Sequence, residues 1–409
     1  MRILLVNKFH WNKGGSEKYY FELGKLLKEH CHEVAYFSMK NDKNVTTGDK
    51  EYFVDEIDLN TGNKLKAVNV IFSFANYKKM IYAIDDFKPD LIHVNNFQRQ
   101  LSSSIIKAAN DRNIPVVFTA HDVQAICPAI TMIDNDKNVC ELCMNGKYFN
   151  CVKKSCNKGS KAKSLIGALE GYYYRNKKVY SKGIDYIITP SEFYRTKFIE
   201  DGINSNHIEA IHNFIIASDY NVETEIGDYA LYFGRLSKEK GINNLIKAFA
   251  KCKNGSLYIA GEGPEKDNIE RFIKDNKLSK RVKLLGFLNK EQMTDTIRKA
   301  RFIVVPSIWY ENCPYSVMET LAIGKPVIGA NIAGIPELVI NNKNGYTYKY
   351  DDINELSEKM NILFEDEKLI SKFSRKAKEM SKKYDKEKYY ERIIKIYKKV
   401  VCEYEKRKN

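Results

Sequence analysis

An alternation of short β-branched runs with helical segments constrains the fold most, and it occurs twice along the chain. Parallel sheets covered by helices have this pattern, because a parallel strand reaches its neighbour through a long, usually helical, crossover. In the first half it predicts strands at Ile3–Asn7, Glu33–Phe37, Asp90–Val94, Pro115–Thr119 and Asp185–Thr189. It predicts helices there near Ser16–Lys28, Phe97–Arg112 and Glu192–Glu200.

After the loop around His212 the pattern restarts. The second set of strands is expected at Tyr229–Phe233, Ser256–Ala260, Val282–Leu285, Phe302–Val305 and Pro326–Gly329. Its helices are expected near Ile242–Cys252, Glu265–Asn276 and Glu291–Lys299. A chain of 409 residues also exceeds the usual size of a single hydrophobic core. The sequence therefore predicts an α/β protein of two doubly wound, Rossmann-like domains, 1–212 and 213–385, that face each other across a nucleotide-binding cleft.

The composition, with 44% hydrophobic and 29% charged residues, is that of a globular protein, and no long low-complexity stretch interrupts it. The apolar run at the N-terminus, Ile3–Val6, is too short for a signal peptide and is typical of a buried strand. No uninterrupted apolar run reaches the length that spans a bilayer. We therefore expect a cytoplasmic protein.

The stretch Tyr310–Glu319 carries the clearest chemical signal. Proline suits a first helical turn, and Gly324 before Lys325-Pro326 is typical of a helix end, so a helix is expected from Pro314 to Ile323. Its first amides would form an anion site suited to a diphosphate, built from Asn312, Cys313, Pro314, Tyr315 and Ser316.

Two glutamates flank this anion site, Glu311 before the helix and Glu319 on its second turn. Carboxylates at both ends of an anion site suggest a ligand with hydroxyl groups on either side. The alternative is an ordinary amphipathic helix with a solvated glutamate.

Three further loops follow predicted strands. The first holds Gly14-Gly15, where paired glycines let the backbone approach a bulky group and Ser16 can cap the next helix. The second holds Arg235 and Lys240, whose charges can neutralise a leaving diphosphate or can simply be solvated.

The third loop, Gly261-Glu262-Gly263-Pro264, invites comparison with dinucleotide sites. The NAD fingerprint is incomplete, because Lys266 stands where a third glycine belongs and no acidic residue ends a following strand at the required distance. Hydride transfer is therefore not expected. A further short loop, Gly286-Phe287, follows the predicted strand Val282–Leu285.

Of seven histidines, His121 is placed at the end of a predicted strand and is followed by Asp122. A single histidine is commonly structural, but this position also suits a ligand contact. His93 is expected to be a packed strand residue.

Together these motifs resemble the retaining glycosyltransferases of family 4, which have the GT-B fold. The resemblance covers nearly the whole chain and is weakest from Asp122 to Lys182, where acceptor choice should be encoded. It implies an acceptor-side domain, 1–212, a donor-binding domain, 213–385, and a last helix, 386–409, that crosses back to the first domain. Cys313 departs from the family, in which small residues are more usual there.

The resemblance also assigns roles. It implies that Glu311 contacts the donor sugar, that Glu319 holds the ribose and that His121 touches the transferred sugar. The diphosphate is assigned to Arg235, Lys240, Gly14 and Gly15, and the nucleotide to Gly261, Gly263, Gly286 and Phe287.

The reaction expected is transfer of a sugar from a nucleotide-sugar donor to a saccharide or lipid-linked acceptor, of hexosyltransferase type, in surface polysaccharide or glycolipid synthesis. Double displacement needs a carboxylate nucleophile, and only Glu311 is a candidate, so departure and attack on the same face fit better. No catalytic metal or cofactor is expected, because Arg235 and Lys240 supply positive charge. Asp134-Asn135-Asp136 is interpreted as a turn. Two rival functions are a catalytically silent partner protein and a nucleotide-sugar epimerase.

Four of the nine cysteines, Cys140, Cys143, Cys151 and Cys156, lie in one polar loop. Such spacing suits a structural zinc site in a reducing compartment. Free thiols or occasional disulfides are the alternatives.

The segment 153–182 holds nine Lys or Arg against one acid, Glu170, interleaved with Leu and Tyr residues. Segments of this composition bind anionic membrane surfaces, which predicts peripheral attachment to the inner face of the membrane. No nucleic-acid-binding module is recognisable, so nucleic acid is not expected as a partner. The other alternative is a solvated basic helix with its aromatic side chains on the core.

Overall fold

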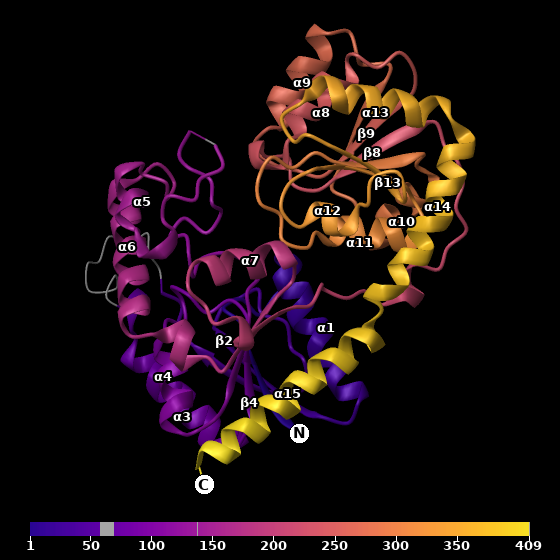
Figure 1. Cartoon of the computed structure of the whole chain (residues 1–409). Helices are drawn as coiled ribbons and strands as arrows, with labels where there is room; N and C mark the ends of the chain where they lie inside the picture. Colours follow the sequence, from indigo (N-terminus) through magenta and orange to yellow (C-terminus); the bar gives the residue numbers. More distant parts are fainter. Residues whose placement is uncertain (58–68, 137, 409) are drawn as a thin grey trace. The chain divides into compact units, whose positions relative to one another are not determined.

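The computed structural model describes residues 1–57, 69–136 and 138–408, which form two compact units. The N-terminal unit comprises Met1–His212 and Tyr389–Asn409, and the C-terminal unit comprises Asn213–Lys388. In each unit, helices cover both faces of a parallel sheet (Figure 1). The predicted α/β fold class is thus confirmed.

The N-terminal unit contains a seven-stranded sheet in the order β3-β2-β1-β4-β5-β6-β7, with every pair parallel. Because helices cover both faces, its strands are continuous apolar runs, and Ile3, Leu4 and Leu5 in β1 are fully buried. The strands are β1 (Arg2–Val6), β2 (Glu33–Met39), β3 (Lys50–Val54), β4 (Leu91–Val94), β5 (Val116–Thr119), β6 (Tyr186–Thr189) and β7 (Ile208–Ala210).

Serine side chains begin three helices of this unit: Ser73, Ser160 and Ser191 each accept a hydrogen bond from a backbone N–H three residues later. The helices are α1 (Gly15–Glu29), α3 (Phe74–Phe87), α4 (Ser104–Asp111), α5 (Phe149–Lys153), α6 (Lys161–Asn176), α7 (Glu192–Glu200) and α15 (Lys386–Lys408), and a short π-helical turn, η2, spans Val179–Gly183.

The C-terminal unit contains a six-stranded sheet in the order β10-β9-β8-β11-β12-β13, also parallel throughout. Its strands are β8 (Tyr229–Phe233), β9 (Ser256–Ala260), β10 (Val282–Gly286), β11 (Phe302–Val305), β12 (Val327–Ala330) and β13 (Gly345–Tyr348). Its helices are α8 (Ile242–Phe249), α9 (Lys266–Asp275), α10 (Lys290–Lys299), α11 (Tyr315–Ile323), α12 (Ile335–Leu338), α13 (Ile353–Glu365) and α14 (Glu367–Ser381). The strand order reverses between β8 and β11, which is where ligands bind in open parallel sheets.

All ten predicted strands are present within two residues of their expected bounds, whereas the sequence pattern missed β3, β7 and β13. The predicted helix at Phe97–Arg112 is wrong in its first half. Arg99 and Ser102 have φ values of 69° and 59°, which a right-handed helix does not allow, so α4 begins only at Ser104.

From Tyr389 onward, α15 packs on the N-terminal unit through tyrosine side chains. The hydroxyl of Tyr389 bonds that of Tyr19, and the hydroxyl of Tyr397 bonds Nδ1 of the fully buried His93. The ring of Tyr390 stacks on His30 with 3.5 Å between centroids. These contacts attach the last helix to β4 and α1.

Replacing Tyr397 by Phe should destabilise the protein by about 1–3 kcal/mol, because the buried Nδ1 of His93 loses its partner. Urea unfolding measures the change. Tyr82→Phe, at a side chain that is 57% exposed, is the matched control and should be close to neutral. Equal stability of the two variants would contradict a structural role for the hydroxyl group of Tyr397.

Candidate active site

In the C-terminal unit, loops from neighbouring strands meet at the carboxyl edge of the sheet, where their backbones approach closely. At Gly241, with φ 71°, a Cβ atom would lie 1.7 Å from the carbonyl oxygen of Pro306. At Gly334 it would lie 1.7 Å from the carbonyl oxygen of Asn312, and the N–H of Gly334 donates to the carbonyl of Glu311 at 2.9 Å. Only glycine fits at these crossings, which fix the loop that carries Glu311.

The Glu311 side chain is the centre of this cluster and is 7% exposed. One oxygen, Oε1, accepts hydrogen bonds from Lys240 Nζ at 2.6 Å, Trp309 Nε1 at 2.7 Å and Ser307 Oγ at 2.8 Å. Burial alone would raise the pKa of this carboxyl, but the charge of Lys240 and the three hydrogen bonds hold the pKa below its usual value. Glu311 is therefore an anion at neutral pH.

The sequence indicated Lys240 and Glu311 but assigned them to different parts of a ligand. The structure joins them in an ion pair, and the Lys240 ammonium also lies 5.2 Å from the centre of the Trp309 ring. An ammonium group has three donors, so Lys240 can hold Glu311 and an anion together. Ser307 and Trp309 were missed, because neither residue type stands out in a loop without the fold.

The helix after this loop starts one residue later than predicted. Pro314 is the N-cap, in an extended conformation with ψ 120°, and α11 runs from Tyr315 to Ile323. Cys313 is buried, which raises the pKa of its thiol to about 12, so it is neutral. Asn312, Tyr315 and Ser316 are half-buried around the helix start.

Glu319 lies further along α11 and is half-buried. The hydroxyl of Tyr220, at the end of the short turn Ala217–Tyr220, donates to its Oε1 at 3.1 Å. Tyr220 lies nearly a hundred residues earlier in the chain, so the sequence gave no indication of this contact.

The loops after β8 and β9 are bonded to each other along their backbones. The N–H of Leu236 donates to the carbonyl of Glu262 at 3.0 Å. At Gly261 and Gly263 a Cβ atom would lie 1.9 Å and 2.3 Å from backbone oxygens of this neighbouring loop. Glycine is therefore required at both positions by the close packing of the two loops. In the loop after β8, Arg235 is exposed.

Gly286, with φ 68°, ends β10, and the Phe287 ring beyond it is 80% exposed. An aromatic side chain exposed to this extent offers a flat face for a ligand ring.

In the N-terminal unit, Gly14 and Gly15 are exposed at the start of α1, as the N-cap and first helical residue. The expected Ser16 cap is wrong, because Ser16 lies inside the first turn. Its hydroxyl instead donates to Oε1 of the buried Glu17 at 3.0 Å.

His121 follows β5 by two residues, with Nε2 2.9 Å from Oδ1 of Asn95 and its ring 4.8 Å from that of Tyr19. Burial, helped by the charge of Lys8, lowers its pKa to about 3. His121 is therefore neutral at physiological pH and can exchange hydrogen bonds without carrying charge. His93 is a packed strand residue, as expected, between Tyr397 and Thr119.

The predicted zinc site gains no support from the structure. Within residues 1–57, 69–136 and 138–408, no group of three or more His, Cys, Asp or Glu side chains is arranged to hold a metal ion. Cys140, Cys143, Cys151 and Cys156 are free thiols, and burial raises the pKa of Cys151 to about 12 and that of Cys143 further.

Comparison with known proteins gives the same assignment for both halves of the chain. Residues 13–218 match the model described as Glycosyltransferase Family 4, and residues 221–380 match Glycosyl transferases group 1. The chain belongs to glycosyltransferase family 4. As such it is a GT-B glycosyltransferase that uses a nucleotide-sugar donor.

Two relatives and one solved structure illustrate the similarity. An uncharacterized 42.6 kDa protein in the cps region of Klebsiella pneumoniae is 27% identical over 83% of this chain and 87% of its own. Alpha-monoglucosyldiacylglycerol synthase of Acholeplasma laidlawii is 23% identical over 78% of each chain. HepE of Anabaena, solved in complex with UDP, superposes with a TM-score of 0.71 at 18% identity, covering 98% of this chain and all of HepE.

The low pKa of His121 makes stability depend on pH. Below about pH 6.5 the unfolded chain protonates this imidazole and the native protein does not, so the free energy of unfolding should fall as pH falls. His121→Gln should weaken this dependence by about 1.4 kcal/mol per pH unit below pH 6.5. Urea unfolding between about pH 4 and 7 measures both slopes, and identical slopes would show that His121 titrates normally.

Proposed function

We propose that this family 4 enzyme is a retaining, metal-independent glycosyltransferase that acts in the synthesis of cell-surface polysaccharide or glycolipid. The observation that carries the proposal is the ion pair between Lys240 and the buried Glu311, which precedes α11 in the chain, with Arg235 exposed in the same loop as Lys240. In this proposal the diphosphate leaves beside the two cationic side chains and the first amides of α11, and sugar hydroxyls bind the carboxylate.

In the proposed reaction the bond between the anomeric carbon and the diphosphate oxygen breaks, and a bond to the acceptor oxygen forms on the same face of the sugar. The proton of the acceptor hydroxyl passes to the departing diphosphate. Arg235, Lys240 and the first amides of α11 stabilise the negative charge that develops there. These cations supply the charge stabilisation for which other transferases use a divalent metal.

Glu311 is proposed to hold sugar hydroxyls rather than to attack the anomeric carbon. Its Oε1 already accepts three hydrogen bonds, which lower the nucleophilicity of the carboxylate and fix its direction. His121, neutral at physiological pH, would exchange a hydrogen bond with the transferred sugar. Gly14 and Gly15 are assigned to the donor diphosphate.

The nucleotide is proposed to lie on the loops that follow β9 and β10. Glu319 would accept hydrogen bonds from the ribose, and the exposed ring of Phe287 with Gly286 would pack against the base. Because the structurally similar HepE was solved with UDP, a UDP-sugar is the first donor to test.

The acceptor is proposed to be a saccharide or a lipid-linked molecule. A relative in the cps region of Klebsiella pneumoniae and a glucosyldiacylglycerol synthase support this class, and the synthase acts on a lipid. No helix among the described residues is both long enough and apolar enough to cross a membrane. A lipid-linked acceptor would therefore have to be reached from the membrane surface.

A surface for that purpose is present on α5 and α6. Of the ten large hydrophobic side chains most exposed among the described residues, five lie within positions 142–172: Leu142, Phe149, Leu165, Leu169 and Tyr172. We call them the apolar face. The last three follow helical spacing on α6, and the N–H of Phe149 donates to the hydroxyl of Tyr172 at 3.1 Å, which joins α5 to the same face.

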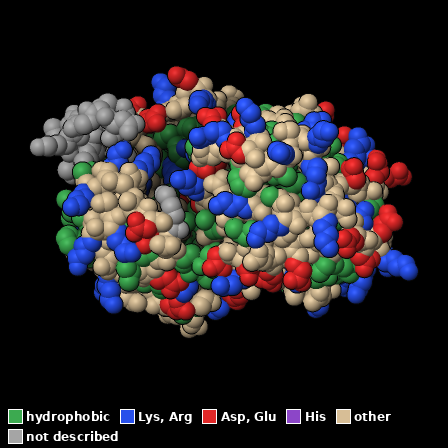
Figure 2. All heavy atoms as spheres, turned by 90° about the horizontal axis from the view of Figure 1, so that it is seen from above, with side chains coloured by type: hydrophobic (Ala, Val, Ile, Leu, Met, Phe, Trp, Pro, Cys, Tyr) green, Lys and Arg blue, Asp and Glu red, His purple; other side chains and the backbone are tan. Residues whose placement is uncertain are grey.

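Exposed lysines lie close to the apolar face in the sequence. Exposed lysines next to it in sequence are Lys147, Lys153, Lys158, Lys161, Lys163 and Lys177. Figure 2 shows blue and green side chains together along the left border of the molecule, the side on which α5 and α6 lie in Figure 1. Because each cation near anionic lipid contributes about 1 kcal/mol, this face fits the negatively charged inner leaflet.

Nucleotide-sugar binding should raise the unfolding temperature, since ligand at a hundred times its Kd adds about 2.7 kcal/mol. A thermal-shift screen with UDP-, GDP- and ADP-sugars should give a shift with one nucleotide. Glu319→Ala should abolish that shift and leave the ligand-free protein folded, whereas Glu270→Ala, on the exposed face of α9, should retain it. A full shift in Glu319→Ala would remove the ribose role of Glu319.

The apolar face should bind vesicles that contain anionic lipid, and added salt should weaken the binding. Replacing Leu165, Leu169 and Tyr172 together by Ser should reduce binding about tenfold or more, because their apolar surface no longer enters the lipid. Co-sedimentation measures this, with Tyr82→Ser as a control at a still more exposed residue of α3. Wild-type protein that stays in the supernatant at low salt would contradict the membrane proposal.

A further inference from the structure

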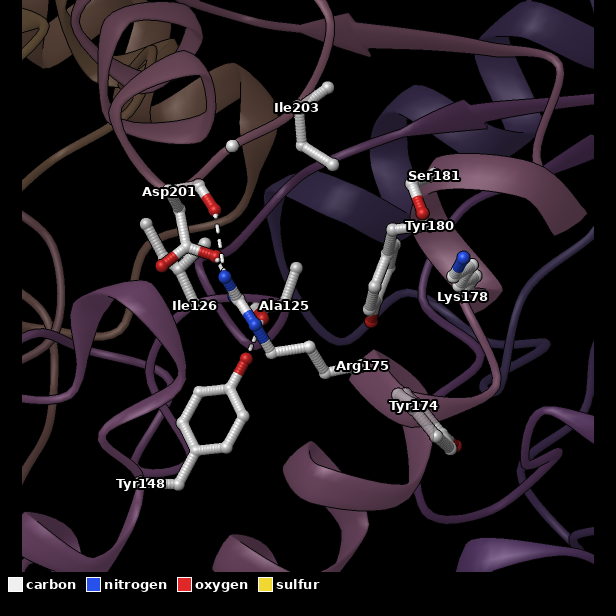
Figure 3. A pocket seen from close by; sticks show the side chains of 11 residues that line it. Ala125, Ile126, Tyr148, Tyr174, Arg175, Lys178, Tyr180, Ser181, Asp201 and Ile203 are labelled. Atoms are coloured by element: carbon white, nitrogen blue, oxygen red, sulfur yellow. Dashed lines mark hydrogen bonds and ion pairs between the residues drawn. The ribbon is translucent and has the colours of Figure 1, made fainter.

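A separate pocket of about 200 Å³ lies wholly within the N-terminal unit (Figure 3). Five segments build it: the loop after β5, the start of α5, the end of α6, the turn η2 and the residues after α7. It is lined by Ala125, Ile126, Tyr148, Tyr174, Arg175, Lys178, Tyr180, Ser181, Asp201, Gly202 and Ile203. None of these residues belongs to the donor site described above.

An ion pair is the polar centre of the pocket. Arg175 Nη1 donates to Oδ2 of Asp201 at 2.9 Å, and Figure 3 shows the guanidinium directed at this carboxylate. The backbone N–H of Asn145 bonds the other carboxylate oxygen, Oδ1. The Arg175 stem lies against Gly146, where a Cβ atom would come within 2.9 Å of it. The pair is therefore held in place before any ligand arrives.

Apolar and aromatic surface surrounds the ion pair. Tyr148 and Tyr180 are almost fully buried, and their hydroxyl groups are already engaged by Ala125 and Gln98. In Figure 3 these rings approach Arg175 from different sides, and Ile203 lies beyond Asp201. Ser181 and Lys178 are exposed. A ligand here would meet tyrosine surfaces, a carboxylate acceptor and guanidinium donors together.

Eight of the eleven lining residues come from Asp122–Lys182, the segment in which we expect acceptor choice to be encoded. Two of them, Ala125 and Ile126, belong to the loop that starts at His121. The pocket is thus joined through one loop to a residue assigned to the transferred sugar.

We propose that this pocket binds one pyranose ring of the acceptor saccharide. A sugar ring has apolar C–H faces that suit tyrosine and vicinal hydroxyl groups that suit an Arg–Asp pair, which offers donors and acceptors side by side. The volume is below the 300–1,000 Å³ usual for small-molecule pockets, so it admits one ring and not a nucleotide. The inference rests on the proposed function in taking the acceptor to be a saccharide.

The lining also bears on which sugar fits. Arg175 and Lys178 carry positive charge and Asp201 negative charge, which leaves one net positive charge around the pocket. A neutral hexose satisfies the ion pair, and a uronic acid would also meet the Lys178 ammonium. Both are pyranoses, so the experiment includes both.

Saturation-transfer NMR of the full chain with glucose, galactose, N-acetylglucosamine and glucuronic acid tests the proposal. At least one sugar should receive saturation on its ring protons. Ser181→Phe, which fills the exposed side of the pocket, should abolish the signal, and Ser279→Phe, at an exposed serine of the C-terminal unit, should retain it. Arg175→Lys keeps the charge but loses the planar fork, and should weaken binding about tenfold.

The thermal shift with UDP-sugar, recorded on the same variants, separates this proposal from the proposed function. If the shift is unchanged in Ser181→Phe while the monosaccharide signal disappears, the pocket is a sugar site apart from the donor site. Absence of saturation for every sugar, or an equal signal in Ser181→Phe, would overturn the proposal. If the sugar signal is lost in Ser181→Phe but no nucleotide sugar shifts the unfolding temperature of the wild type, the pocket proposal stands and the proposed donor is contradicted.

Discussion

The buried carboxylate of Glu311 is the interaction on which the candidate active site depends. A carboxylate that is 7% exposed is stable as an anion only if charge and hydrogen bonds replace the water it has lost, and Lys240, Trp309 and Ser307 do so. The same three bonds fix the direction of the carboxylate and the position of the Lys240 ammonium. The Lys240 ammonium and the Glu311 carboxylate, which we propose contact a sugar diphosphate, thus hold each other in place.

Close backbone contacts at two glycines fix the loops that carry this cluster. Gly241 and Gly334 let neighbouring loops approach to distances that no side chain permits, and the loop that carries Glu311 is held between them. The N-terminal unit uses a different device, a hydrogen-bonded chain in which Tyr397, His93 and Thr119 join α15 to the ends of β4 and β5. His121 lies two residues beyond β5. A shift of α15 would therefore move the end of β5, and with it His121, through these hydrogen bonds.

The apolar face lies in the segment between β5 and β6, which also supplies eight of the eleven residues that line the pyranose pocket; Asp201, Gly202 and Ile203 follow α7. This segment leaves the sheet after Thr119 and returns only at Tyr186, which frees it from the packing demands of the parallel strands. Its exposed hydrophobic residues on α6 face outward, while Tyr174 and Tyr180 are buried in the same unit. This segment therefore supplies the apolar face and most of the pocket lining, both of which we propose serve the acceptor.

The sequence alone determined the class of fold and ten of the strands, because parallel strands buried on both faces must be apolar runs. Glycine, proline and charged residues marked the loops after them, and the donor contacts assigned to those loops stay a prediction. It could not show that Glu311 pairs with Lys240, that Tyr220 bonds Glu319 or that Arg175 meets Asp201. Each of these contacts joins residues distant in the chain, and only the packing of the strands and helices brings them together.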